Sequence, residues 1–288
     1  MASRILASQR RVESIPQLLL PPFPTRGFSL RLKIAAVMLL IIGAVAVTAP
    51  WIAPYDPSAI SPSDRLLPPN LDHLFGTDMF GRDLFSRVLY GASPTLQVAL
   101  GAVIIGALPG LALGMIAGSK RGVFDQVVTQ IADAWNALPG VLVALVMIAA
   151  LGRSVVVLVL ALGISSIPTF YRMVRAETMR VAAEPFVEAA VSLGACHRAV
   201  LMRHIIPNIA PSLLALVTIS VGRMLLATSA LSFIGLGAPP PSPEWGSLLA
   251  EGRAHMEQNW WLIWFPGATI AVTTFAIYLF GNSFRDSR

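Results

Sequence analysis

Six long apolar runs determine what this chain can fold into. They cover residues 34–52, 95–117, 127–151, 155–171, 208–233 and 260–281. A helix of about 20 apolar residues crosses the hydrocarbon core of a bilayer and satisfies its own backbone hydrogen bonds there. Hydrophobic residues form 55% of the chain and charged residues only 12%, which excludes an ordinary soluble domain. We therefore predict an all-α integral membrane protein with six transmembrane helices.

Two of these runs leave the number of spans open. The third run is interrupted by the sequence DAWNALPG at residues 133–140, and the fourth run is short. An odd number of spans results if one of them is re-entrant. The first run is too long for the apolar part of a secretory signal peptide, so we expect an uncleaved anchor. The basic segment before it also has the composition of a transit peptide.

Basic residues mark one side of the membrane as cytoplasmic. If residues 1–33 lie inside, fifteen Lys and Arg residues fall on the cytoplasmic side and five on the other side, and Arg223 alone falls within a run. This asymmetry follows the positive-inside rule. We predict a cytoplasmic segment over residues 1–33 and a transmembrane domain over residues 34–288, with both termini in the cytoplasm. External loops then cover residues 53–94 and 234–259, and a cytoplasmic loop covers residues 172–207.

The composition also argues against other kinds of site. The net charge of +6 is spread over separate segments, so no domain-sized basic face for nucleic acid is expected. Cys196 is the single cysteine, which excludes an intrachain disulfide. The spacing of Asp72, His73, Asp78 and Asp83 fits no calcium or zinc pattern, so we expect no bound metal.

The cytoplasmic loop contains a short predicted helix in the sequence EPFVEAAVSLG, residues 184–194. Pro185 suits the first helical position, and Gly194 suits the left-handed residue that ends a helix. A narrow apolar stripe is formed by Phe186, Val187, Ala190 and Val191. This pattern is compatible with an amphipathic linker on the membrane surface or with a helix that docks on a partner protein.

Four segments resemble one family of membrane proteins. The cytoplasmic loop has EAA at residues 188–190, Gly194 four residues later, and IIP at residues 205–207. This pattern resembles the EAA loop of the membrane subunits of ATP-binding-cassette (ABC) importers. The segments HLFGTDMFGRDLFSRVLYGA, LSFIGLGAPPPSPEWGSLLAEGR and FPGATIAV are similar to the second permease subunit of the dipeptide and oligopeptide branch. The resemblance covers residues 30–288.

The resemblance implies a type I ABC permease fold in a bacterial inner membrane. Glu188, Ala189, Ala190 and Gly194 then belong to a coupling helix that docks on an ATPase subunit, with Phe186 and Val187 in a pocket of that partner. Pro207 and Pro211 then provide a hinge at the base of the fifth span. The implied partners are a second homologous permease, two ATP-binding subunits and an extracytoplasmic solute-binding protein. ATP and Mg²⁺ belong to the ATPase subunits, since this chain has no G-x-x-x-x-G-K-[ST] loop. We therefore expect neither a catalytic site nor a cofactor on this chain.

The identity of the cargo is left open by the sequence. Di- or oligopeptides are the cargo that the resemblance implies, and related importers carry nickel, glutathione or haem-like compounds. The four histidines all lie outside the apolar runs, which disfavours nickel. A stand-alone secondary transporter needs acidic residues within its spans, and only Asp133 meets that condition.

Asp133 and Arg223 are the charged residues expected at membrane depth, where charges are functional candidates. We expect them at different depths and therefore not as a direct pair. Asp133 either faces the pathway or caps a broken helix. Arg223 either extends toward the outer surface or lines the pathway and attracts a peptide carboxylate. Thr228 occupies a position that is often acidic in the family, which bears on the charge of the cargo.

Both external loops contain a predicted helix start. In FGTDMFGRD, Gly76 and Gly81 make turns and Asp83 caps a helix, which either braces the second span or receives the binding protein. A further helix is expected from about Glu244. It is followed by an interfacial aromatic belt at Trp260, Trp261 and Trp264. We expect a basic patch of the binding protein to meet the acidic residues Glu244, Glu251 and Glu257.

Overall fold

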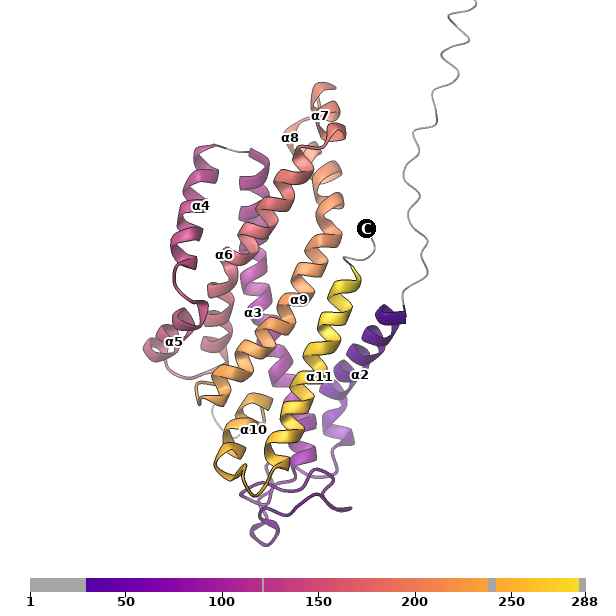
Figure 1. The fold of residues 1–288 in the computed structure, drawn as a ribbon, viewed down its shortest axis with the longest axis vertical. Coiled ribbons are helices and arrows are strands. Elements are labelled where there is room, and N and C mark those ends of the chain that lie inside the picture. Colours follow the sequence, from indigo (N-terminus) through magenta and orange to yellow (C-terminus); the bar gives the residue numbers. More distant parts are fainter. Residues whose placement is uncertain (1–29, 121, 238–241, 285–288) are drawn as a thin grey trace, which may run out of the picture.

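The computed structural model describes residues 30–120, 122–237 and 242–284 as an elongated bundle of helices (Figure 1). Most of segment 1–33 therefore lies outside the described residues. The described part contains no strand, only an isolated bridge between Thr77 and Asp83. The long helices are α2 (Leu30–Ile52), α3 (Leu84–Lys120), α4 (Val123–Asn136), α5 (Gly140–Leu151), α6 (Val155–Ala182), α9 (Ile206–Phe233) and α11 (Trp261–Ser283). The short ones are η1 (Pro62–Asp64), α7 (Pro185–Ser192), α8 (His197–Val200), η2 (Leu201–Ile205), α10 (Trp245–Gly252) and η3 (Arg253–His255). This arrangement confirms the predicted all-α class.

The helices give five candidate membrane spans, or six if α4 and α5 together make one. These two helices meet at a 78° bend, so the apolar run 127–151 is not one straight helix. The break falls in DAWNALPG, where Pro139 is the N-cap of α5 with φ −54° and ψ 127°. Proline fixes φ and has no N–H to continue the α4 hydrogen bonds, which explains the break. The remaining spans are α2, α3, α6, the continuous segment His197–Phe233, and α11.

Two helices are longer than the apolar runs that predicted them. α3 begins at Leu84 and α6 ends at Ala182, so both predicted loops, 53–94 and 172–207, are partly helical. An apolar run marks only the part of a helix that matches the hydrocarbon core. A helix continues past that core as long as its backbone bonds are satisfied, which composition does not reveal.

The centre of the bundle is the close contact between α3 and α6. A stripe of small residues at four-residue spacing on α3 makes this contact possible, formed by Gly106, Gly110, Gly114 and Gly118. A Cβ at Gly114 would lie 2.8 Å from the Tyr171 carbonyl oxygen, and one at Gly118 would lie 2.7 Å from the Thr178 Cβ. Only glycine allows the two backbones to approach so closely.

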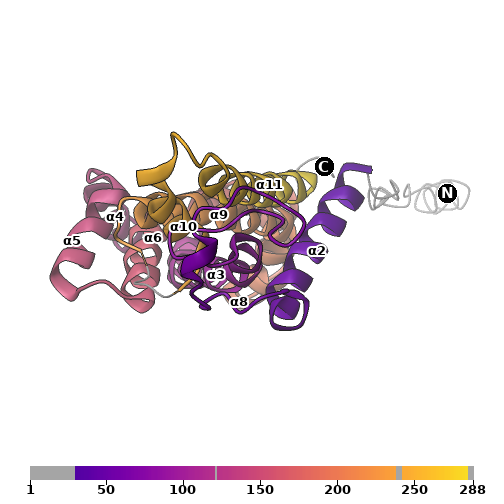
Figure 2. The ribbon, with the colours of Figure 1, turned by 90° about the horizontal axis from the view of Figure 1, so that it is seen from below.

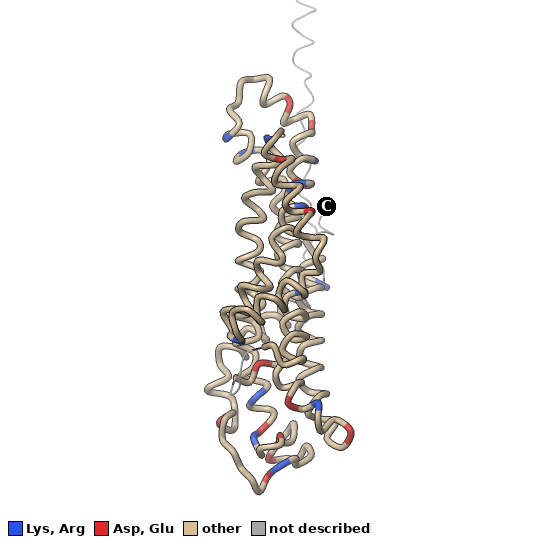
Figure 3. The backbone as a smooth tube through the Cα atoms, turned by 90° about the vertical axis from the view of Figure 1, so that its left-hand side faces the viewer, with Lys and Arg blue, Asp and Glu red and all other residues tan. Residues whose placement is uncertain are grey.

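The two ends of the bundle carry most of its charge (Figure 3). One end, called here the α7 end, carries α7 and α8 (Figure 1). The opposite end, called here the α10 end, carries the segment before α3, α10 and the turn that precedes α11. Seen from the α10 end, α4 and α5 lie on one side of the bundle and α2 lies on the other (Figure 2).

Candidate functional site

The short helix α7 has the start and the end that the sequence predicts. Glu184 is its N-cap, and Pro185 occupies the first turn. Gly194 follows the helix with φ +86°. The Gly194 N–H donates to the Val191 carbonyl (2.9 Å), and the Ala195 N–H donates to the Ala190 carbonyl (3.1 Å). These two bonds form a Schellman motif, which ends α7 sharply.

The inner side of α7 is anchored in the chain's own core. Val187 is only 4% exposed, and it belongs to a small cluster at the α7 end formed by Val181, Val187, Val200, Ile205 and Ile209. The prediction that Val187 fills a pocket of a partner is therefore wrong. Its β-branched side chain instead fixes α7 against α6, α8 and the start of α9.

The opposite side of α7 is open, and we call it the outer face of α7. Phe186 is 43% exposed, and Glu188 and Ala189 are exposed beside it. Leu193 extends this face with an 89% exposed side chain, and Val191 is also exposed, on the side of Val187. The sequence reasoning missed Leu193, the C-cap residue of α7 directly before Gly194. The outer face is therefore largely apolar, with one acidic residue.

The entry into α9 is irregular at the predicted hinge. The π-helical turn η2 (Leu201–Ile205) joins α8 to α9, and Pro207 lies in the first turn of α9. Pro211 lies inside the same helix. A π-turn and two prolines each remove regular backbone hydrogen bonds, and such positions are where helices bend.

Two ion pairs connect α4 to α6. Asp125 forms a two-contact pair with Arg175, in which Arg175 Nη2 donates to Asp125 Oδ2 at 2.7 Å. The hydroxyl groups of Thr129 and Tyr171 bond to each other at 2.7 Å beside this pair. The sequence reasoning missed the pair, because residues 50 positions apart give no local pattern.

The second pair joins Asp133 to Arg172 at 3.7 Å. Both side chains are open to the surroundings, with exposed fractions of 57% for Asp133 and 50% for Arg172. Arg223, by contrast, is exposed on α9 and takes part in no ion pair among the described residues. As expected, Asp133 and Arg223 do not pair directly. Thr228 on the same helix is fully buried, and its Oγ1 has no hydrogen-bond partner in the described part.

A buried charge cluster holds the α10 end together. The side chain of Arg87 is 1% exposed and donates to Asp78 (2.7 Å) and to Glu251 (2.7 Å). Arg82 donates to the same two carboxylates, at 2.6 Å and 2.7 Å. We call these four residues the charge clasp. It joins the loop before α3 to α10, which are far apart in the sequence.

The charge clasp corrects the role expected for the acidic residues. Glu251 is engaged by two arginines, so it does not present a free charge to a binding protein. Glu244 is fully buried and accepts a bond from the Ser232 hydroxyl (2.7 Å). Of the three acidic residues, only Glu257 is exposed. Glu244 is instead the N-cap residue of α10, at the position where the sequence predicts that helix to start.

The predicted turns and cap before α3 are confirmed. Gly76 and Gly81 have φ of +73° and +75°. Asp83 accepts a bond from the Ser86 N–H (2.7 Å), which caps α3. Because α3 continues into the second span, this segment is the start of that span and not a separate bracing helix. Trp261 is only 5% exposed and donates to the Thr77 carbonyl, so it packs inside and is not part of an interfacial belt.

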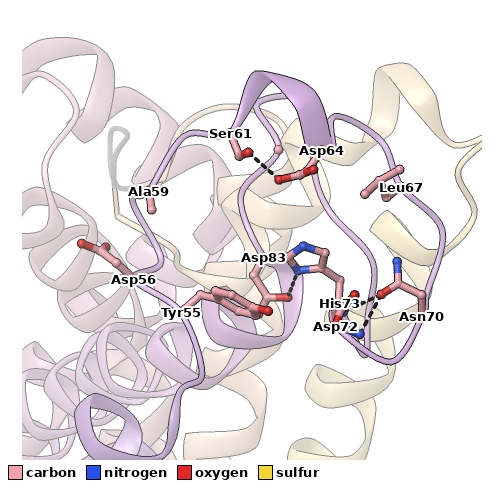
Figure 4. Close-up of a pocket in the computed structure, with 11 residues that line it drawn as sticks. Tyr55, Asp56, Ala59, Ser61, Asp64, Leu67, Asn70, Asp72, His73 and Asp83 are labelled. Carbon is pink, nitrogen blue, oxygen red and sulfur yellow. Dashed lines mark hydrogen bonds and ion pairs between the residues drawn. The ribbon is translucent and has the colours of Figure 1, made fainter.

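An open cleft of about 450 Å³ lies beside this cap. Figure 4 shows His73 pointing toward Asp83, with their side chains 2.9 Å apart, and Ser61 bonded to Asp64. Asp56 is exposed at the rim of the cleft. The carboxylates of Asp64 and Asp83 are therefore occupied by this chain's own donors, and they stabilise the loop before α3.

Comparison with known proteins identifies the family. Residues 110–286 match the family described as "Binding-protein-dependent transport system inner membrane component". Residues 33–69 match the "N-terminal TM domain of oligopeptide transport permease C". A putative peptide transport system permease protein of Brucella suis is 41% identical over 254 residues, which cover 88% of this chain and 86% of the relative. The glutathione transport system permease protein GsiD of Escherichia coli is also 41% identical, over 88% of this chain and 84% of the relative.

Solved structures show the same fold at low sequence identity. The inward-facing MetNI methionine ABC transporter superposes with a TM-score of 0.60 at 15% identity, over 70% of this chain and 96% of that chain. An amino acid ABC transporter crystallised with histidines gives a TM-score of 0.54 at 22% identity, over 67% of this chain and 90% of that chain. The predicted ABC importer permease fold is thus confirmed. The chain belongs to the binding-protein-dependent transport system inner membrane component family, and it is an ABC importer permease subunit of the peptide/oligopeptide type.

Proposed function

We propose that this permease subunit forms half of the transmembrane pathway through which an ABC importer takes up di- or oligopeptides. The relatives that are 41% identical carry names of peptide and glutathione transport systems, which supports a peptide-like cargo. A second homologous permease supplies the other half of the pathway. Two ATP-binding subunits bind ATP and Mg²⁺, and an extracytoplasmic binding protein delivers the cargo. This chain binds no cofactor of its own.

The proposed orientation places the α7 end in the cytoplasm together with both chain termini. The distribution of Lys and Arg supports this orientation, because basic segments stay on the cytoplasmic side. The α10 end then faces the binding protein. Exposed acidic residues are available there. Among them are Glu257 and Asp56, which lies at the rim of the cleft in the loop before α3.

The observation that carries the coupling role is the shape of α7. Its inner side is fixed by Val187, its end is fixed by Gly194, and its outer face is exposed and largely apolar, with the ring of His204 6.3 Å from that of Phe186. Exposed apolar surface of this kind favours docking on another protein. We assign Phe186, Glu188, Ala189, Ala190 and Gly194 to docking on an ATPase subunit.

The proposed motion begins at this docking helix. When the ATPase subunits close, they displace α7, and α7 moves the ends of α6 and α9 to which it is anchored. Pro207 and Pro211 let α9 bend relative to its first turns, because the backbone bonds there are already interrupted. The Asp125–Arg175 pair carries the movement of α6 to α4.

The experiment that tests the docking role replaces Phe186 with alanine in the assembled importer. Phe186→Ala removes a partly exposed aromatic ring from the outer face and leaves the buried Val187 in place, so the complex should insert and be stable. Uptake, and the stimulation of ATPase activity by the binding protein, should both fall at least about fivefold, as for loss of one interface hot spot of more than about 1 kcal/mol. Phe275→Ala is the matched control, since Phe275 is 59% exposed on α11. Equal uptake in the two variants would contradict the docking role.

Glutathione is the second candidate cargo, favoured by the 41% identical relative named as a glutathione transport permease. Competition in the reconstituted importer distinguishes the two. If the cargo is a general peptide, unlabelled dipeptides compete with a labelled peptide and glutathione does not. If glutathione competes with the labelled peptide and unlabelled dipeptides do not, the cargo is glutathione and not a general peptide.

A further inference from the structure

A polar stripe runs along α4 on the open side of the bundle. Gln126, Gln130 and Asp133 are all exposed, and their spacing of four and three residues puts them on one helix face. Arg172 reaches this stripe from α6 through its contact with Asp133. The stripe is a feature of one side of the molecule, because α4 lies on the side of the bundle opposite α2 (Figure 2).

This stripe lies on α4, which together with α5 makes a candidate broken span, and next to α6, which is a candidate span by itself. Arg172 is seventeen residues after Val155, or about 26 Å along α6 at about 1.5 Å per residue. This distance places Arg172 near one end of a hydrocarbon core of about 30 Å, directly after the apolar run 155–171, while Asp133 lies inside the apolar run 127–151. Charged groups do not face lipid at such depths without a large energetic penalty, and they face a bundle interior or a water-filled cavity instead. The exposed side chains of α2 are mostly Leu, Ile and Val, as expected for a lipid-facing helix.

The Asp133–Arg172 pair is loose compared with its neighbour. Its N···O distance of 3.7 Å exceeds that of a hydrogen bond, whereas the Asp125–Arg175 pair makes two close contacts. The guanidinium of Arg172 is half exposed, and no hydrogen bond from it to the described residues is formed at this distance. A planar guanidinium with free donors is suited to bind a carboxylate by two parallel hydrogen bonds.

We propose that Arg172 is a cargo-selecting residue of the translocation pathway, which binds a carboxylate of the passing cargo, and that Asp133 is its counter-ion when no cargo is present. The inference rests on the proposed peptide import and goes beyond it, because it names the chemical group that the pathway recognises. A loose pair suits this exchange, since the cargo carboxylate replaces Asp133 with little loss of existing bonds. The stripe of Gln126 and Gln130 continues the polar surface along the pathway.

The first test compares two cargoes in the reconstituted importer with its binding protein. One is a peptide with a free C-terminal carboxylate, and the other is the same peptide with a C-terminal amide and its side chains uncharged. The quantity measured is kcat/KM of each variant relative to wild type, so any preference of the binding protein cancels. Arg172→Gln should lower kcat/KM for the carboxylate peptide about tenfold, as for loss of a charge-assisted hydrogen bond at a partly exposed site. It should leave kcat/KM for the amide peptide unchanged.

Two further variants separate selection from structure. Arg172→Lys keeps the positive charge but not the two parallel hydrogen bonds, so it should restore only part of the preference for the carboxylate peptide. Lys33→Gln removes an exposed cation from α2 and should leave kcat/KM unchanged for both peptides. The inference would be overturned if Arg172→Gln lowered kcat/KM equally for both peptides, or if it lowered kcat/KM for neither. Absence of peptide uptake by the wild-type importer would instead refute the proposed cargo.

A second test examines whether the stripe faces water, independently of transport. In a Cys196→Ser background, cysteines are placed at Gln130 and at the neighbouring Ile131, which is also exposed in this chain at 60%. A charged, membrane-impermeant thiol reagent applied to the assembled importer should modify the cysteine at position 130 and not the one at 131. Protection of both positions, or modification of position 131 alone, would show that the stripe does not line an aqueous pathway.

Discussion

Gly194 provides the sharpest single-residue test of the coupling helix. Its φ of +86° is a conformation that residues with a side chain rarely adopt, and no atom lies within 4 Å of a Cβ built there. Gly194→Val therefore causes no clash in this chain, and its cost is the backbone strain of roughly 1–2 kcal/mol for a left-handed L residue. An energy of that size changes the population of the native helix end by a factor of about 5–30.

The chain offers a matched control for this strain. Gly152, at the end of α5, also has φ +86° and no atom within 4 Å of a Cβ built there. Gly152 has ψ 171°, a combination with positive φ that only glycine readily adopts, so Gly152→Val imposes a backbone cost at least as large in a turn far from α7. Gly194→Asn is a second control, because asparagine tolerates the left-handed conformation and should retain most of the coupling.

The assay is uptake and ATP hydrolysis by the complete importer in proteoliposomes. Gly194→Val should assemble normally but lower uptake per ATP hydrolysed at least about fivefold, the lower limit of the population change worked out from the strain. Gly152→Val should stay near wild type. If both valine variants lost the same fraction of uptake per ATP hydrolysed, general destabilisation, and not the position of α7, would be the cause of the defect. Wild-type uptake and ATPase stimulation in Gly194→Val would refute the coupling role itself.

Three other predictions concern the charged residues. Asp125→Asn should destabilise the subunit by about 2 kcal/mol, because a hydrogen-bonded ion pair between α4 and α6 is lost, and the thermal unfolding midpoint of the purified importer measures this. Arg87→Met should cost about 3–5 kcal/mol, since it leaves the buried Asp78 and the partly exposed Glu251 with Arg82 as their one arginine in the charge clasp, and the subunit should fail to accumulate in membranes. Arg253→Met, at an exposed arginine near the clasp, should accumulate as wild type does, and equal accumulation of both would contradict the role of the clasp. Arg223→Ala should reduce uptake of carboxylate-bearing peptides if Arg223 lines the pathway, and unchanged uptake of charged and neutral peptides would exclude that role.

Local features of this chain were predictable from the sequence because they depend on neighbouring residues. The start of α7 at Pro185 and its end at Gly194 follow from backbone preferences of proline and glycine. The cap of α3 at Asp83 and the break before Pro139 have the same origin. The glycine stripe on α3 is also a four-residue repeat in the sequence, which indicates close contact with another helix but not that this helix is α6.

Pairings between distant segments were not predictable in this way. Glu251 looked like a free acidic residue, because nothing near it in the sequence indicates that Arg82 and Arg87 surround it. Val187 and Phe186 are adjacent apolar residues, and only the packing of α7 shows that one is buried and the other exposed. Arg172 was counted as a loop residue, since the apolar run ends at position 171 while α6 continues to Ala182.

The most direct test of the whole account uses the single cysteine of the chain. Cys196 is exposed two residues after Gly194, next to the outer face of α7. A short bifunctional maleimide applied to the assembled importer should link Cys196 to a cysteine introduced in the docking surface of an ATPase subunit, and Cys196→Ser should abolish the product. A membrane-impermeant reagent added outside intact cells should not reach Cys196. Labelling of Cys196 from outside, or a cross-link to the binding protein in place of the ATPase, would contradict the claim that α7 couples ATP hydrolysis to transport.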